Sequence, residues 1–126
     1  MSIHTTLRYD DPQAAIDFLT GALGFRELHC YRGDDGTIAH AELAWDDRGD
    51  TAVLALGARR AGDRFDTGRA VLYLTCEDPD ALHERAVAAG AEVVMGLTDQ
   101  DYGSREFAVA DAEGNVWSLG TYRMGG

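Results

Sequence analysis

The chain has 126 residues, 45% of them apolar, which is enough for one ordinary compact domain but not for two independent hydrophobic cores. Its 22 acidic and 11 basic residues give a net charge of -11, and such a surface repels the phosphate backbone of nucleic acids. No apolar run approaches the length of a membrane-spanning helix and the N-terminus lacks a secretory pattern, so we expect a soluble, cytoplasmic protein without nucleic-acid or membrane partners.

The acidic surface has two interpretations, because it can attract a cationic small molecule or simply keep the protein in solution. The two cysteines are less ambiguous. Cys30 and Cys76 lie in strand-like runs without a metal-ligand spacing, which favours reduced core thiols over a disulfide or a metal site.

The first half of the chain reads as a strand, a helix and three further strands. The helix begins at Asp11-Pro12, where aspartate can accept from free backbone N–H groups and proline suits the first helical position. Apolar residues then recur at helical spacing until Gly24, which provides the stop. The strand-like runs that follow are 25–32, 37–45 and 51–57, with a turn rich in Asp and Gly at 46–50.

The second half repeats this pattern. Asp78-Pro79 aligns with Asp11-Pro12, again between a strand and a helix, and Gly90 ends that helix. The strand-like runs that follow are 91–95, 105–110 and 116–122, with the turn DAEGN at 111–115 before the last. The sequence therefore contains two βαβββ modules, over residues 1–57 and 69–126, joined by a linker over residues 58–68.

Neither module, at about 55 to 60 residues, would bury enough surface to be stable alone. We therefore expect a single α+β domain over residues 1–126. In it the two modules combine into a curved mixed sheet around a concave cavity, with the helices outside.

The paired module carries specific motifs: YDDP and CEDP at the helix starts, and DAEGN before the last strand. With them the chain resembles the vicinal oxygen chelate superfamily, which includes glyoxalase I, extradiol dioxygenases, fosfomycin-modifying enzymes and bleomycin-resistance proteins. The segments AHAEL (39–43) and DYGSREF (101–107) are similar to motifs of its PhnB-like and bleomycin-resistance-like branches. The resemblance implies a small-molecule ligand and a homodimer.

The resemblance also locates the positions at which family enzymes hold a divalent metal ion. They fall on His4, Val53, Val71 and Ser118. Valine has no lone pair to give, and a neutral serine hydroxyl is a poor ligand for a transition metal. We therefore predict no metal and no other cofactor, and a binding protein in place of a glyoxalase-type lyase or dioxygenase. The alternative is a metalloenzyme with ligands elsewhere, such as His4, His40 and Glu42.

Strand alternation predicts which side chains face the cavity. His4 and Arg8 share one face of the first strand, and Tyr73 and Ser118 occupy the corresponding face of the second module. These four residues are candidates for ligand contact. Trp117 points the other way, which favours core packing over ligand contact.

His40 and Glu42 are two residues apart on a strand and share a face. A glutamate that accepts from one ring nitrogen would fix the imidazole tautomer, producing a general base or a proton-dependent binding group. A metal-free enzyme with His40 as base is therefore a further alternative. The other interpretation is a polar pair that satisfies only its own hydrogen bonds.

Three further residues are candidates for ligand contact. Tyr102, in the polar segment 97–104, can stack on a ligand, because such loops often flank a site on a rigid scaffold. Arg105 can bind an anion or pair with Asp101 or Glu106. Trp45 can stack on a planar ligand or cover a dimer seam. Together these residues predict a protein that sequesters an aromatic or cationic compound, such as an antibiotic.

Overall fold

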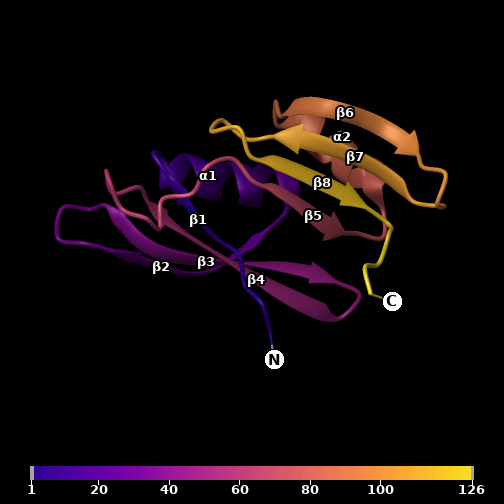
Figure 1. The fold of residues 1–126 in the computed structure, drawn as a ribbon. Helices are drawn as coiled ribbons and strands as arrows, with labels where there is room; N and C mark the ends of the chain where they lie inside the picture. The colour runs from indigo at the N-terminus through magenta and orange to yellow at the C-terminus, as the bar shows by residue number, and fades with distance from the viewer. Residues whose placement is uncertain (1, 126) are drawn as a thin grey trace. The chain divides into compact units, whose positions relative to one another are not determined.

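The computed structural model describes residues 2–125 and divides the chain into two compact units, Met1–Gly68 and Arg69–Gly126. Each unit is a βαβββ module with one four-stranded mixed sheet, which confirms the expected α+β class (Figure 1). The segment 58–68, expected as a linker, is grouped with the first unit. No helix within residues 2–125 is long and apolar enough to cross a membrane.

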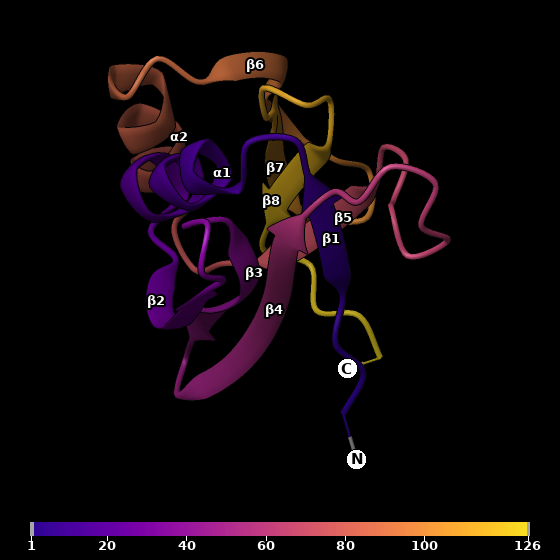
Figure 2. The same ribbon diagram turned by 90° about the vertical axis from the view of Figure 1, so that its left-hand side faces the viewer.

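The first unit begins with a strand and a helix and continues with three strands. Its elements are β1 (Thr6–Tyr9), α1 (Pro12–Phe18), a π-helical segment (Leu19–Leu23), β2 (Arg26–Arg32), β3 (Ile38–Asp47) and β4 (Asp50–Ala58). The sheet order is β1-β4-β3-β2, with β1 parallel to β4 and the other pairs antiparallel. Figure 2 shows β1 running alongside β4.

The second unit has the same topology. Its elements are β5 (Val71–Thr75), α2 (Pro79–Ala88), β6 (Glu92–Asp99), β7 (Arg105–Ala110) and β8 (Val116–Gly120). The sheet order is β5-β8-β7-β6, with β5 parallel to β8. The repeat found in the sequence is therefore a repeat of strand order as well.

Both helices begin as the sequence predicts. The Asp11 carboxylate accepts from the Ala14 N–H at 3.0 Å, and the Asp78 carboxylate accepts from the Ala81 N–H at 3.1 Å. Gly24 ends the first helical stretch in the left-handed region, with φ of 89°, which a residue with a Cβ rarely adopts. These caps depend on neighbouring residues alone, which explains why the pattern predicts them.

The predicted strand 91–95 is too short. β6 continues to Asp99, so three residues of the expected polar loop, 97–99, lie in a strand instead. The strand pairs with β7, Thr98 opposite Glu106 and Asp99 opposite Arg105, after one register shift on each side of Met95. β6 is an edge strand, and edge strands tolerate polar side chains and bulges that hide their period in the sequence.

Each sheet buries one face beneath its own helix. In the first unit α1 contacts β1 and β4, and in the second unit α2 contacts β6 and β7. The largest fully buried side chains of the first unit are Leu7, Tyr9, Leu19, Leu23, Ile38, Leu43 and Leu56, and those of the second are Phe107, Val109, Trp117 and Leu119. Trp117 is thus a core residue, as strand alternation predicts.

The DAEGN turn is organised by the buried carboxylate of Asp111. One oxygen accepts from the backbone N–H groups of Glu113 and Asn115, each at 3.0 Å. The other oxygen accepts from the Trp117 indole at 3.1 Å, so the same side chain closes the turn and fixes the core tryptophan. The Asn115 side-chain oxygen accepts from the Ala70 N–H at 2.9 Å, which ties the turn to the start of β5.

Gly120, the last residue of β8, is required by close packing. A Cβ at this position would overlap the Glu106 Cγ and the Tyr73 hydroxyl, whereas a Cβ at Gly96 in β6 would meet nothing within 4 Å. We expect Gly120→Ala to lower the free energy of unfolding by about 1–3 kcal/mol, because extra atoms in a well-packed region force neighbours to move. Urea denaturation measures this effect. Gly96→Ala is the matched control, and equal losses in the two variants would contradict the prediction.

Candidate functional site

Four polar side chains gather on the face of the first sheet that α1 does not cover. We call His29, Tyr31, His40 and Glu42 the imidazole–tyrosine patch. Strand pairing places Tyr31 opposite His40 and His29 opposite Glu42, on the neighbouring strands β2 and β3. The intervening residue of β3, Ala41, is fully buried, so the patch and the core lie on opposite faces of the strand.

The rings of the patch form a continuous stack. The His29 and Tyr31 ring centroids are 5.8 Å apart at an interplanar angle of 20°, and those of Tyr31 and His40 are 6.3 Å apart at 27°. Tyr31 is 56% exposed. The patch therefore presents nearly parallel aromatic faces that a ligand can reach.

The predicted hydrogen bond between His40 and Glu42 is confirmed. His40 Nε2 lies 2.8 Å from Glu42 Oε2, and both side chains are partly exposed. An ionised carboxylate only accepts, so the ring nitrogen Nε2 carries the proton and donates. On the far side of Glu42, strand β4 places Ala55 opposite it.

The four family metal positions do not form a donor set. His4 is exposed, and its Nδ1 lies 2.9 Å from the Val53 carbonyl oxygen. Val71 is 76% exposed, and Ser118 lies opposite Tyr73 in the β5–β8 pair. Over residues 2–125 no three His, Cys, Asp or Glu side chains lie close enough together to hold a metal ion. These residues do not fit the divalent metal of the family enzymes.

Strand pairing also gives Ser118 a second counterpart in the first unit. Ser118 pairs with Tyr73, and Thr6, which aligns with Tyr73 when the helix caps are superposed, pairs with Ala55. The sequence alignment of the turns gives Val53 instead, because the first turn has two residues between paired Asp47 and Asp50 whereas DAEGN is longer. Neither the alanine nor the valine side chain has a lone pair, so neither counterpart of Ser118 can coordinate a metal ion.

In the second unit a buried glutamate gathers three hydroxyl groups. Tyr102 donates to Glu106 Oε1 at 2.7 Å, while Tyr73 and Ser104 donate to Oε2 at 2.8 Å and 2.9 Å. The Glu106 residue is 4% exposed. We call these four residues the Glu106 cluster. It joins β5, β7 and the 100–104 turn, and Tyr122 adds its backbone N–H to the Tyr73 and Ser104 oxygens, both at 3.1 Å.

Burial alone raises the pKa of the Glu106 carboxyl, but the hydrogen bonds from Tyr102, Tyr73 and Ser104, with a further one from Gln100, lower it below its ordinary value of 4.5. The same contact acts in the opposite direction on the phenol. Its hydrogen bond to Glu106 raises the pKa of Tyr102 to about 12. The cluster therefore holds an ionised carboxylate and neutral phenols at neutral pH.

The remaining candidates are engaged in structural contacts. Arg8 forms an ion pair with Asp66 at 3.4 Å, and Thr67 accepts from its backbone N–H at 3.1 Å. Arg105 does not pair with Asp101 or Glu106; its guanidinium pairs with Asp80 at 2.6 Å and Asp99 at 3.1 Å.

Trp45 lies on the other face of β3 from His40 and Glu42, because their positions alternate along the strand. Its ring packs against Phe25 with centroids 5.1 Å apart. The structure therefore does not bring Trp45 to the imidazole–tyrosine patch.

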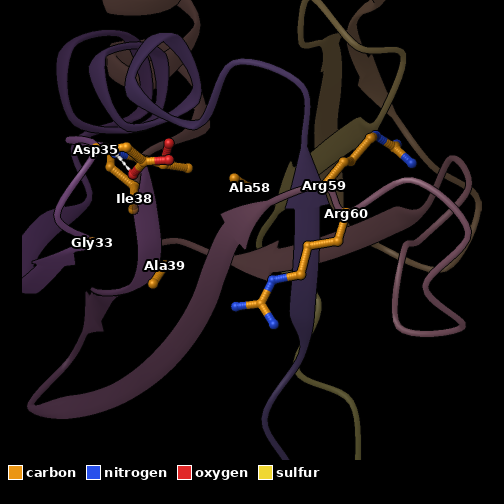
Figure 3. Close-up of a pocket in the computed structure, with 8 residues that line it drawn as sticks. Gly33, Asp35, Ile38, Ala39, Ala58, Arg59 and Arg60 are labelled. Atoms are coloured by element: carbon orange, nitrogen blue, oxygen red, sulfur yellow. Dashed lines mark hydrogen bonds between the residues drawn. The ribbon is translucent and has the colours of Figure 1, made fainter.

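A cavity of about 300 Å³ lies between the β2–β3 turn and the end of β4. It is lined by Gly33, Asp35, Thr37, Ile38, Ala39, Ala58, Arg59 and Arg60. Asp35 accepts from the Thr37 N–H at 2.9 Å, and Figure 3 shows Arg59 and Arg60 pointing in opposite directions. The two guanidinium groups therefore do not converge on one ligand position.

Sequence reasoning missed His29 and Tyr31, and it used Glu106 only as a pairing option for Arg105. A signal for Tyr31 was present, because His29 and Tyr31 alternate on one strand as His40 and Glu42 do on the next. Glu106 had a partial local signal, because Tyr102 and Ser104 lie four and two positions before it. Its partner Tyr73 lies 33 positions away along the chain.

We expect Glu106→Gln to lower the free energy of unfolding at pH 7 by about 2 kcal/mol, because the hydroxyls lose an ionised acceptor. A carboxyl whose pKa is lower in the folded protein stabilises the fold at pH values above its pKa in the unfolded chain. This stabilisation is lost as the pH falls through the pKa in the folded protein. The difference between wild type and variant should therefore shrink below pH 4.5, the ordinary value. Denaturation at several pH values measures it. Glu84→Gln is the control, because Glu84 is an exposed residue of α2. A difference in unfolding free energy between wild type and Glu106→Gln that does not change with pH would contradict the prediction.

Comparisons with known proteins agree with this architecture. The family model of the Glyoxalase/Bleomycin resistance protein/Dioxygenase superfamily matches residues 2–119. The uncharacterized protein Mb0911c of Mycobacterium bovis is 36% identical over 116 residues, covering 88% of this chain and 76% of that protein. A lactoylglutathione lyase of Neisseria meningitidis is 29% identical over 115 residues, covering 89% of this chain and 83% of the lyase.

Among solved structures, TioX from Micromonospora sp. ML1 is 32% identical to this chain with a TM-score of 0.77, and the match covers 98% of this chain and 99% of TioX. The family model spans both βαβββ units, and the relatives match nearly the whole chain. The chain belongs to the Glyoxalase/Bleomycin resistance protein/Dioxygenase superfamily.

Proposed function

We propose that this protein binds a planar, cationic aromatic small molecule without a metal ion, on the imidazole–tyrosine patch of the first unit. The observation that carries the proposal is the exposed ring stack of His29, Tyr31 and His40 beside the Glu42 carboxylate. Membership of a family that includes bleomycin resistance proteins supports a small-molecule ligand.

The stack favours a flat ligand. Its interplanar angles of 20° and 27° leave the rings nearly parallel, so a planar molecule can extend the stack with little rearrangement. Aromatic pairs in such offset arrangements contribute about 0.5–1.5 kcal/mol beyond the area they bury. An exposed tyrosine also loses little conformational entropy on binding, since its side chain has few rotatable bonds.

The charge of the site favours a cation. Glu42 is partly exposed, and His40 contacts only one of its two carboxylate oxygens. The other oxygen can accept a hydrogen bond from a cationic ligand. A cationic ring over Tyr31 gains from the negative face of the phenol as well. The net charge of -11 raises the local concentration of cations around the protein.

We expect 9-aminoacridine, a planar cation, to bind with a change in its own fluorescence. Tyr31→Leu and Glu42→Gln should each weaken binding by about tenfold, because each removes one of the two interactions. The anion 9-anthracenecarboxylate has the same three-ring size and should bind at least tenfold more weakly.

Phe65→Leu is the matched control, because Phe65 is another exposed aromatic of the first unit, at 70% exposure. Unchanged affinity in Tyr31→Leu, or equal affinity for the anionic and cationic probes, would contradict the proposed site.

The metal-free character is tested separately. We expect protein purified without chelators to contain no stoichiometric transition metal, and EDTA to leave probe binding unchanged, because the four family positions offer one imidazole and one hydroxyl. Elemental analysis by mass spectrometry measures the metal content. A stoichiometric metal that is lost in His4→Ala would support a glyoxalase- or dioxygenase-type enzyme instead.

A metal-free enzyme is the second candidate function, and the 2.8 Å bond between His40 and Glu42 favours it. A carboxylate that orients an imidazole is the arrangement of a general base. Chemical conversion of a bound ligand that is lost in His40→Ala, with binding retained, would distinguish this candidate from sequestration. The cytoplasmic location and the homodimer stay predictions.

A further inference from the structure

We propose a second binding site, in the second unit, where Tyr102 and Tyr122 form an aromatic corner for a small organic ammonium group. The two ring centroids are 5.5 Å apart and the ring planes meet at 78°. Tyr102 is 59% exposed and Tyr122 is 44% exposed, so both rings are accessible. Proteins recognise quaternary ammonium groups with aromatic ring faces, and two rings that meet at a steep angle offer two such faces to one ligand.

The corner is ordered before any ligand arrives, because the Tyr102 side chain and the Tyr122 backbone are hydrogen-bonded and the two rings pack against each other. The Tyr102 hydroxyl donates to Glu106 Oε1 at 2.7 Å. Tyr122 is fixed through its backbone, because its N–H donates to the Tyr73 hydroxyl at 3.1 Å and its carbonyl accepts from the Thr75 hydroxyl at 2.9 Å. Binding to such a preorganised pair costs little conformational entropy.

The carboxylate behind the corner determines what kind of cation fits. Glu106 is 4% exposed, and both of its oxygens accept hydrogen bonds from hydroxyl groups of the cluster. A cation in the corner is therefore attracted by the negative charge but meets ring faces and no free carboxylate oxygen. A strongly hydrated ion such as sodium would lose its water without gaining a ligand atom, whereas a methylated ammonium carries a diffuse charge and little water.

The phenol state supports the same conclusion. The hydrogen bond to Glu106 raises the pKa of Tyr102 to about 12, so the ring stays a neutral phenol across the physiological range. The hydrogen bond that the phenol donates to a carboxylate makes the ring more electron-rich, which strengthens its attraction for a cation. The nearby Arg105 guanidinium is bound by Asp80 and Asp99.

Choline tests this site against its neutral isostere, 3,3-dimethylbutan-1-ol, which has the same shape without the charge. We expect choline to shift the ring resonances of Tyr102 and Tyr122 in NMR spectra at constant ionic strength, and the neutral alcohol to shift them at least tenfold less at the same concentration. Equal shifts with the two probes, or no shift with choline, would overturn the proposal.

Variants separate the corner from the fold. Tyr122→Leu keeps the backbone bonds of residue 122 and should weaken choline binding by about tenfold. Tyr102→Phe keeps the ring but loses the bond to Glu106, so it should retain more affinity than Tyr102→Leu. Unchanged choline affinity in Tyr122→Leu, measured in protein with a native amide spectrum, would also overturn the proposal.

The corner and the imidazole–tyrosine patch can be distinguished in the same experiments. Tyr31→Leu should weaken the binding of 9-aminoacridine and leave the binding of choline unchanged. Tyr122→Leu should weaken the binding of choline and leave the binding of 9-aminoacridine unchanged. Loss of choline binding in Tyr31→Leu would assign the ammonium site to the first unit and contradict the corner.

Discussion

The buried carboxylate of Glu106 is the constraint on which the second unit depends. Removing an ionised carboxylate from water costs several kcal/mol unless hydrogen bonds replace the lost hydration. Here the replacement comes from the hydroxyls of Tyr73, Tyr102 and Ser104. Since these residues belong to β5 and to the turn before β7, one charge fixes the positions of segments that are distant in sequence. Gly120 completes the arrangement, because only a residue without a Cβ lets the Glu106 side chain and the Tyr73 phenol approach β8.

The first unit uses its glutamate differently. Glu42 is partly exposed and bonds one imidazole, so most of its hydration is kept and little stability depends on it. A carboxylate in that state is available to a ligand. The same residue type therefore organises the fold in one unit and stays accessible in the other, and the difference lies in burial and in the number of donors.

The parts of the structure that depend on neighbouring residues could be predicted from the sequence. The caps at Asp11 and Asp78 and the bond between His40 and Glu42 each join residues at most four apart. The stack of Tyr31 on His40 could not be predicted in the same way, because it depends on the register of two strands with a bulge on each side of the stack. In the Glu106 cluster, Tyr102 and Ser104 lie within four residues of Glu106 and so within reach of sequence reasoning. The contact of Tyr73 with Glu106 joins residues 33 positions apart, and no period or spacing encodes it.

The four family metal positions carry one imidazole, one hydroxyl and two valine side chains. A metal-independent site on this acidic protein would therefore rely on ring faces and carboxylates to attract a small molecule. Glu42 can reach a ligand directly and so favours a flat cation that stacks and pairs at once. Glu106 is covered by hydroxyls and acts only through its field, which favours a compact cation without hydrogen-bond donors. The accessibility of each carboxylate thus determines the chemistry of the ligand that its aromatic neighbours can hold.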